Sequence, residues 1–374
     1  MILGAGFAGL ELATRLSESL AEQVGVTLID QSDAFSFGYS KLDVLFGRKA
    51  TEDVLLSYAD ISKAGVEFRR ERVVSIEPET RRVTTDQQSY DADVLVVALG
   101  AEYDFAATPG FEEGGFEYYS LPGAERMRDA LPEFESGTIL IGILGQPFKC
   151  PPAPFEGALL LHDYLVQRGI RKSAEIRVIG PMAAPVPITK EVSQSILDAL
   201  GEREIEYVAN QRITELDTRR KHALLASHGS VTYDLFVGIP VHRVPEVVEA
   251  SGLAVDGWIP VERTNLATRF ADVYAVGDVA GAPVAKAGVF AESAAAVVAG
   301  DIAARLRGDP PQRPWDGAGN CFIEFGGGAV GKVEANFLGG QAPTARLVGP
   351  SPALAAEKDA FGATRRERWF GRAA

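Results

Sequence analysis

The two cysteines of this 374-residue chain lie in contexts that favour thiol redox chemistry. Cys150 stands in a proline-rich loop, residues 149–154 (KCPPAP), and Cys321 lies in a predicted strand. Glu156 follows closely enough to carry a proton for a thiol, and Lys149 could lower the pKa of the Cys150 thiol. Two unrelated buried thiols are the alternative. A redox pair requires that the two Cα atoms, distant in sequence, come within about 7 Å.

A glycine-rich turn at the N-terminus predicts a dinucleotide-binding loop. Gly4, Gly6 and Gly9 form a GxGxxG pattern between a short apolar strand and a helix with apolar residues at helical spacing. This pattern gives a tight turn, a close approach of backbone to a pyrophosphate and a helix packed close to its strand. The next predicted strand ends at Asp30, where a carboxylate suits an unphosphorylated ribose. The stretch therefore favours FAD or NAD over NADP.

A second stretch, residues 270–281, predicts the other end of a flavin site. A strand ends at Gly277, and Asp278 could accept a hydrogen bond from a ribityl hydroxyl. Lys286 then precedes a helix of small residues predicted over 290–306, whose N-terminal N–H groups could face the N1–O2 edge of a reduced flavin. Together with the N-terminal glycines, this favours FAD over a chance Gly-Asp turn.

The alternation of strands and helices predicts an α/β fold with two Rossmann-like, three-layer domains, inserted antiparallel strands and a small C-terminal sheet domain. We assign residues 1–104 and 231–308 to the FAD-binding domain, 105–230 to the second Rossmann-like domain and 309–374 to the C-terminal domain. In the second domain, the strand at 138–143 leads into the cysteine loop, where prolines remove donors that would bind phosphate. That domain is therefore predicted to lack a nicotinamide site.

Charge and hydropathy limit the partners. The net charge of −14 and a pI near 4.9 argue against a nucleic-acid partner. No apolar run reaches the roughly 18 residues of a membrane span, and the tail, residues 353–372, is predicted to cap the core, so membrane contact is at most peripheral. No signal peptide is visible, but the first strand looks trimmed. We expect a cytoplasmic protein or one on the membrane surface, with the periplasm and a homodimer left open; no metal site is predicted.

At residues 149–154, Gly277-Asp278, 286–292 and Cys321-Phe322, the sequence resembles the sulfide:quinone oxidoreductase and flavocytochrome c sulfide dehydrogenase flavoprotein family. The resemblance is collinear over nearly the whole chain. The cysteine loop is quite specific to that family, whereas the Gly-Asp stretch is shared with the wider two-dinucleotide flavoproteins, including type II NADH dehydrogenases.

The resemblance implies roles for individual residues. Cys150 and Cys321 match the redox pair, Glu156 the proton carrier, and Phe322 an aromatic that lines the quinone pocket. The implied FAD contacts come from both glycine stretches and the strands between them: Gly4, Gly6, Phe7, Ala8, Gly9, Asp30, Gln31, Lys41, Val74, Ala98, Leu99, Gly100, Gly277, Asp278, Lys286, Ala287 and Gly288.

The sequence also departs from the family pattern, and each departure leads to a prediction. Residues 110–128 hold no third cysteine, so a two-cysteine cycle is expected. No further cysteine is available to bind the flavin, so FAD should be non-covalent. None of the four histidines has a clear catalytic match; His242 is the best candidate, although surface or helix positions suit all four better.

Three functions remain open. The first is an FAD-dependent oxidoreductase that oxidises sulfide, a persulfide or a thiol through Cys150 and Cys321 and passes electrons to a quinone or an electron-acceptor protein. The alternative is an NAD(P)H-dependent flavin reductase resembling type II NADH dehydrogenase. The third is a flavin-binding protein without catalysis. Reduction of the flavin by sulfide, by NADH or by neither would distinguish them.

Overall fold

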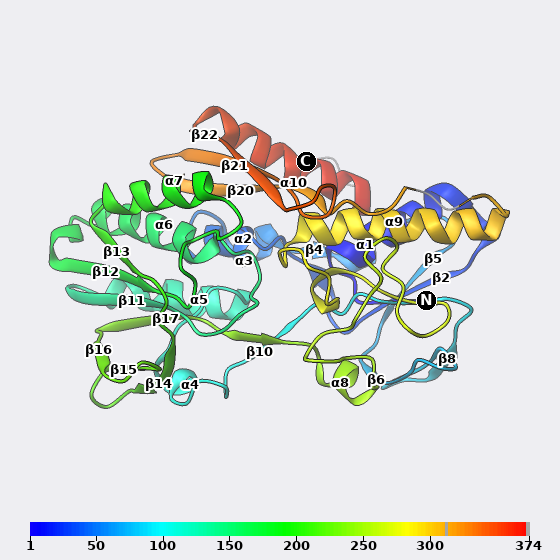
Figure 1. Ribbon diagram of the computed structural model, residues 1–374, viewed down its shortest axis with the longest axis horizontal. Coiled ribbons are helices and arrows are strands. Elements are labelled where there is room, and N and C mark those ends of the chain that lie inside the picture. Colours follow the sequence, from blue (N-terminus) through cyan, green and yellow to red (C-terminus); the bar gives the residue numbers. More distant parts are fainter. Residues whose placement is uncertain (311–312, 372–374) are drawn as a thin grey trace.

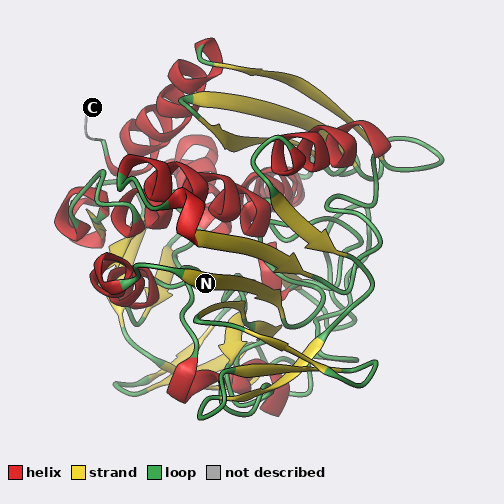
Figure 2. Ribbon diagram, turned by 90° about the vertical axis from the view of Figure 1, so that its left-hand side faces the viewer, coloured by secondary structure: helices red, strands yellow, loops and turns green. Residues whose placement is uncertain are grey.

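Two parallel sheets in the computed structural model organise the two halves of the chain, and a third, antiparallel sheet lies across both (Figure 1). The structure describes residues 1–310 and 313–371. The fold is α/β, as predicted. In the side view, helices lie between the C-terminal strands and the parallel strands (Figure 2).

The first unit is built on a five-stranded parallel sheet in the order β19-β9-β1-β2-β5. Strands β19, β9 and β1 of this sheet are apolar and buried, as expected for parallel strands covered on both faces. The sheet strands are Val273–Ala275, Leu95–Val97, Ile2–Leu3, Val26–Asp30 and Val66–Arg70. Helices α1 (Phe7–Leu20) and α9 (Gly288–Arg307) pack side by side on it. The smaller elements of this part of the chain are β3 (Ala34–Phe35), β4 (Leu56–Ser57), β6 (Val73–Glu77), β7 (Arg82–Thr85), β8 (Ser89–Asp91), α2 (Ser40–Leu45), α3 (Thr51–Val54) and α8 (Glu246–Ala250).

The second unit repeats this plan with a four-stranded parallel sheet in the order β13-β12-β11-β17. The strands are Ile205–Val208, Ala174–Ile179, Gly137–Ile143 and Leu235–Ile239. Helices α6 (Ala153–Gln167) and α7 (Lys190–Gly201) contact each other, and α6 contacts the sheet. The remaining elements are α4 (Phe111–Gly114), α5 (Leu121–Ala130), β14 (Ile213–Asp217), β15 (His222–Leu225) and β16 (Ser230–Thr232).

The predicted boundary at residue 231 is wrong. Strand β17 pairs with β11 from Ile139↔Leu235 to Ile143↔Ile239, so it belongs to the second unit. It pairs with β11 in the second sheet as β9 pairs with β1 in the first. The two strands have the same sequence pattern, a buried run with a glycine at or near its end, so the pattern does not show which sheet each one joins. The chain leaves the first unit through β10 (Glu102–Asp104) and returns to it through β18 (Val241–Arg243), and these two strands pair antiparallel.

The C-terminal segment forms the predicted sheet, with three strands, β20 (Ala318–Gly326), β21 (Ala329–Asn336) and β22 (Thr344–Ser351), and a helix, α10 (Ala353–Phe370). In the range 309–374 assigned to it, residues 311–312 and 372–374 lie outside the described part of the chain. Figure 1 shows the segment in orange and red along the top of both units. Its core is shared: Phe325 and Leu347 join the second unit's core, and Trp369 joins the first. It therefore bridges the two units.

Helix α10 is fixed to α1 by a buried carboxylate. Glu11 is fully buried and receives Arg368 Nε at 3.0 Å and Trp369 Nε1 at 2.8 Å. The Trp369 ring packs edge-on against Phe7 of the N-terminal glycine loop, with ring centroids 5.5 Å apart. The tail therefore caps the core, in agreement with the prediction. Among the described residues, no helix has both the length and the hydropathy needed to cross a membrane.

Candidate functional site

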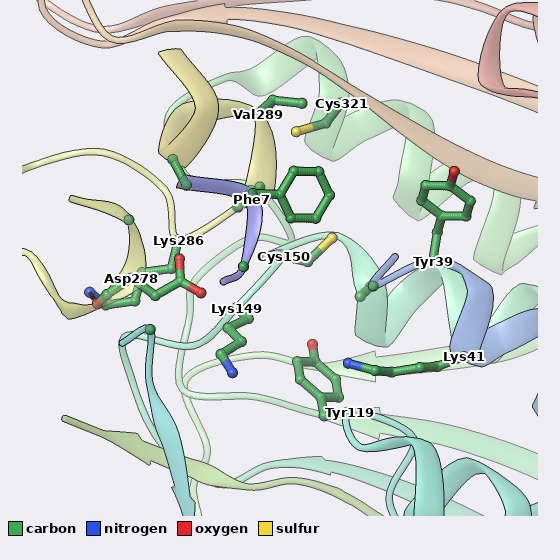
Figure 3. A pocket seen from close by; sticks show the side chains of 18 of the residues that line it. Phe7, Tyr39, Lys41, Tyr119, Lys149, Cys150, Asp278, Lys286, Val289 and Cys321 are labelled. Carbon is green, nitrogen blue, oxygen red and sulfur yellow. Dashed lines mark hydrogen bonds between the residues drawn. The ribbon is translucent and has the colours of Figure 1, made fainter. Parts of the chain in front are cut away.

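A cavity of about 350 Å³ lies where the two units and the C-terminal segment meet. Figure 3 shows Cys150 and Cys321 pointing into it from different parts of the chain. The cavity brings together residues predicted from both glycine stretches, the cysteine loop and β20: Gly6, Phe7, Ala8, Lys41, Ala98, Gly100, Cys150, Glu156, Gly277, Asp278, Lys286, Ala287, Gly288, Cys321 and Phe322.

The N-terminal glycines form a loop that fits a phosphate. A Cβ at Gly4, which has φ +97°, would lie 2.3 Å from the Ala98 carbonyl oxygen, and one at Gly9 would lie 1.9 Å from the Gly4 carbonyl oxygen. These two glycines do not line the cavity. Their role is to let the turn, the helix and the strand pack closely against one another. A Cβ at Gly6, in contrast, would have no atom within 4 Å. Since α1 has no side-chain cap, its first N–H groups are available to an anion beside that open space.

Four other predicted FAD contacts lie outside the cavity wall: Asp30, Gln31, Val74 and Leu99. Asp30 holds the glycine loop, since its Oδ2 accepts the Ala5 N–H at 2.8 Å and its Oδ1 accepts the Ser32 N–H at 2.8 Å. Each carboxylate oxygen keeps a second lone pair for a ribose hydroxyl. Val74 lies in β6 with a side chain that is 43% exposed, and its contact with FAD stays a prediction.

The turn at Gly277 and Asp278 fits the other end of a flavin. Gly277 has φ +77°, a conformation that favours glycine. Lys286 fixes this turn, because its Nζ donates to the carbonyl oxygens of Asp278 at 2.6 Å and Ala280 at 3.3 Å. Its ammonium also lies 3.4 Å from the centre of the Trp258 ring. Burial lowers the pKa of Lys286 to about 8. The open glycine loop and this turn together fit FAD.

The cysteine loop is tied to the segment that leads into α9. The Cys150 N–H donates to the Lys286 carbonyl oxygen at 2.7 Å, and the Cys150 carbonyl accepts the Ala153 N–H, where α6 begins. Cys150 therefore lies beside the residues that directly precede α9. Cys321 reaches the same cavity from β20, although 171 positions (321 minus 150) separate the two in sequence. Both are free thiols.

Both thiols are less acidic than ordinary cysteines. Burial, followed by the charge of Glu156, raises the pKa of Cys150 well above its usual value and the pKa of Cys321 to about 12. The prediction that Lys149 lowers the pKa of Cys150 is wrong. The Lys149 Nζ donates to the Ala101 carbonyl at 2.7 Å and lies 4.5 Å from the centre of the Tyr103 ring. Figure 3 shows it pointing away from the sulfur.

Glu156 has the protonation behaviour of a proton carrier. It lies in the first turn of α6, is only 3% exposed, and accepts the Glu324 N–H at 2.8 Å. Burial raises the pKa of Glu156 to about 7, helped by the charge of Glu324 and opposed by Lys358 and Arg48. It lines the same cavity as both thiols, and its charge helps to raise the pKa of each. The carboxyl group can therefore give or take a proton near neutral pH beside either sulfur.

His242 supports the cysteine loop from behind. It is 6% exposed, which corrects the expectation of a surface or helix position. Its Nδ1 donates to the Pro240 carbonyl at 2.8 Å, and its Nε2 accepts the Lys149 N–H at 3.3 Å. Burial, followed by the charge of Lys149, lowers the pKa of His242 to about 3, so the ring stays neutral. It acts on the site by positioning the loop.

Replacing His242 with phenylalanine should reduce stability without changing the pH dependence of flavin reduction. The variant leaves the Lys149 N–H and the Pro240 carbonyl without partners, which costs about 1–3 kcal/mol in the free energy of unfolding. Chemical denaturation measures this loss, with His222→Phe on the surface strand β15 as the control. A kinetic pKa that disappears in His242→Phe would contradict the positioning role.

Several cavity residues were not predicted. Tyr118 and Tyr119 line the wall from a segment that reads as a loop, and Lys358 and Phe361 line it from α10. The Phe361 ring lies edge-on to Phe322 at 6.0 Å. Lys358 and Phe361 stand three positions apart on one helix face, a spacing visible in the sequence. The two tyrosines carry no such local signal.

Comparison with known proteins identifies the general family. A family model described as pyridine nucleotide-disulphide oxidoreductase matches residues 1–145 and 156–300. The ten residues between these matches, 146–155, contain the cysteine loop. The chain thus departs from the family model in the loop that carries Cys150.

Two curated relatives are similar over most of the chain. One is the mitochondrial sulfide:quinone oxidoreductase of Dictyostelium discoideum, 25% identical over 342 residues that cover 86% of this chain and 74% of that protein. The other is the sulfide-quinone reductase of Aquifex aeolicus, 25% identical over 353 residues that cover 87% and 81%. The X-ray structure of the sulfide:quinone oxidoreductase from Aquifex aeolicus superposes with a TM-score of 0.87 at 23% identity, covering 99% of this chain and 92% of that one. That likeness shows a shared fold.

Proposed function

The chain belongs to the pyridine nucleotide-disulphide oxidoreductase family, and we propose that it is an FAD-dependent enzyme that oxidises sulfide and passes the electrons to a quinone. The observation that carries this proposal is that Cys150, Cys321 and Glu156 line the same cavity as both flavin-binding stretches. The two sulfide:quinone relatives support it.

The two thiols can oxidise sulfide by disulfide exchange. In the oxidised enzyme Cys150 and Cys321 form a bridge, which one hydrosulfide attacks; the S–S bond breaks, leaving a persulfide on one cysteine and a thiolate on the other. A second hydrosulfide removes the outer sulfur as disulfane anion and leaves both cysteines reduced. Re-forming the bridge releases two electrons, so two HS⁻ give HSS⁻, one proton and two electrons.

Glu156 supplies and removes the protons that this exchange requires. The thiols have raised pKa values, so a thiolate that leaves the bridge takes up a proton readily. A carboxyl group with a pKa of about 7 can supply that proton and remove it again before the bridge re-forms. FAD, when bound, accepts the electron pair and transfers it to the quinone. We propose that it is held without a covalent bond, since the only two cysteines belong to the redox pair.

The acceptor side of the cavity is formed by the C-terminal segment. Phe322 and Phe361 present aromatic faces and edges there, and the Lys358 ammonium lies 5.2 Å from the centre of the Tyr39 ring. A flat, apolar quinone ring fits between aromatic side chains. Phe322 is proposed as part of this acceptor pocket.

The NAD(P)H-dependent alternative is less well supported by the second unit. Between β11 and α6, where a second phosphate loop would lie, the chain has Pro147, Pro151 and Pro152, none of which offers an N–H donor. The space beside the α6 N-terminus is instead occupied by the cysteine loop.

Anaerobic reduction tests the proposal. Sulfide should bleach the flavin absorbance of the FAD-bound protein within seconds, and a soluble quinone should restore it. NADH at the same concentration should bleach it at least about 100-fold more slowly, because no built site holds the nicotinamide near the flavin. Stopped-flow spectrophotometry measures both rates. Fast bleaching by NADH with none by sulfide would favour the flavin reductase instead.

A further inference from the structure

One part of the cavity has a role that the redox pair, Glu156 and the acceptor pocket do not explain. The Tyr119 side chain is 6% exposed and lines the cavity, yet its hydroxyl has no hydrogen-bond partner among residues 1–310 and 313–371. A buried hydroxyl without a partner is costly, commonly by about 1–3 kcal/mol. Such a group is expected to receive its partner from a ligand.

Lys41 is the second group at this place. It lines the cavity from α2, and no hydrogen bond or ion pair joins its ammonium to any described residue. Burial, and then the charge of Lys149, lower the pKa of Lys41 to about 8, so it is still mainly charged at neutral pH. Figure 3 shows the ammonium of Lys41 directed at the Tyr119 side chain, across the cavity from Asp278 and Lys286.

The two groups lie near Cys150. Tyr119 and Cys150 line the same cavity, and Figure 3 shows the Tyr119 hydroxyl directed toward the Cys150 side chain. An ammonium has donors only, and a hydroxyl can donate, so a ligand shared by both must accept hydrogen bonds. A negative ligand would also offset the cost of the buried positive charge, which a neutral one would not.

We propose that Lys41 and Tyr119 form an anion-binding subsite that holds the anionic sulfur substrate, hydrosulfide, beside Cys150. The inference rests on the proposed function and adds two substrate-binding residues to it. It also gives Lys41 a different role from the FAD contact that the resemblance implies. The subsite raises the local concentration of hydrosulfide at the sulfur that it attacks and aligns it by two hydrogen bonds.

The test uses the FAD-bound protein and two anions. Thiocyanate, an inert soft anion, is titrated against the flavin absorbance, and sulfide is used in anaerobic stopped flow. In Lys41→Met the Kd for thiocyanate should rise at least about tenfold, and in Tyr119→Phe about three- to tenfold. The sulfide concentration that gives half-maximal bleaching should rise by similar factors, while the limiting rate changes less. Lys49→Met, which changes an exposed lysine paired with Asp43 outside the cavity wall, should change neither value.

Stability separates a ligand-binding hydroxyl from a structural one. Tyr118 is the matched control, since its hydroxyl already donates to the Ala153 carbonyl at 3.1 Å. Tyr118→Phe should lower the melting temperature, whereas Tyr119→Phe should leave it unchanged or raise it when no anion is present. Equal destabilisation by both variants would overturn the proposal.

Three further results also bear on the proposed anion-binding subsite. Unchanged thiocyanate and sulfide binding in both Lys41→Met and Tyr119→Phe would overturn the subsite. Loss of FAD from Lys41→Met, measured by the ratio of flavin to protein absorbance, would return Lys41 to the cofactor and overturn it too. If sulfide fails to bleach the wild type, the proposed function fails by itself, and the thiocyanate titration still tests the anion site.

Discussion

Replacing Cys150 or Cys321 with serine should lower the rate of flavin reduction by sulfide at least about 1,000-fold. A serine hydroxyl can form neither the bridge nor a persulfide, so the sulfur substrate loses its covalent path to the electrons. Anaerobic stopped flow measures the rate. The double variant should be no slower than either single one, because each change alone removes the whole bridge.

The control for these variants is a reductant that needs no thiol. Dithionite should reduce the flavin of both serine variants as fast as that of the wild type, and their FAD content should be unchanged. Ellman's reagent under denaturing conditions should find no thiol in the oxidised wild type and two after reduction, as in the structure. A serine variant that kept a tenth of the sulfide rate would show that the thiols are bystanders.

The flavin-binding half of the cavity was predictable because its signals are local. Gly9 is required by its contact with Gly4 within one β-α unit, and Gly4 and Gly277 by their own backbone conformations, so each leaves a mark in a short stretch of sequence. The sulfur chemistry was harder to place. Cys150 and Cys321 line one cavity only because the C-terminal sheet lies across both units, which no local pattern specifies.

The errors have the same origin. Lys149 adjoins Cys150 in sequence, but the loop turns the two side chains apart, so its charge acts on Tyr103 and His242 instead. The misplaced boundary arose because the repeated units share one strand pattern, and only strand pairing shows which sheet β17 (Leu235–Ile239) completes. Tyr119 stands in an irregular segment, where periodicity gives no indication of which side chains are buried.

Replacing Glu156 with glutamine should slow turnover with sulfide about 100-fold and remove a step from its pH dependence. General acid–base groups commonly contribute factors of about 10²–10⁴. At sulfide concentrations that saturate the enzyme at every pH, so that the ionisation of the substrate does not set the rate, the wild-type rate should rise with pH through about 7, where Glu156 becomes able to take up a proton. The glutamine variant should show no such rise. Glu191→Gln, an exposed glutamate in the first turn of α7, is the matched control and should behave as the wild type.

Glu156→Gln should also make the free energy of unfolding less dependent on pH. Because folding raises the pKa of Glu156 from 4.5 to about 7, the folded state binds more protons than the unfolded state between these pH values. The free energy of unfolding of the wild type should therefore fall as the pH rises from 4.5 to 7, by on the order of 3 kcal/mol from this group alone. A glutamine has no charge to bury and can still accept the Glu324 N–H, so Glu156→Gln should lose less stability over this range. Urea denaturation at several pH values measures the difference. Equal pH dependence in the two proteins would mean that Glu156 titrates as an ordinary carboxylate and is no proton carrier at neutral pH.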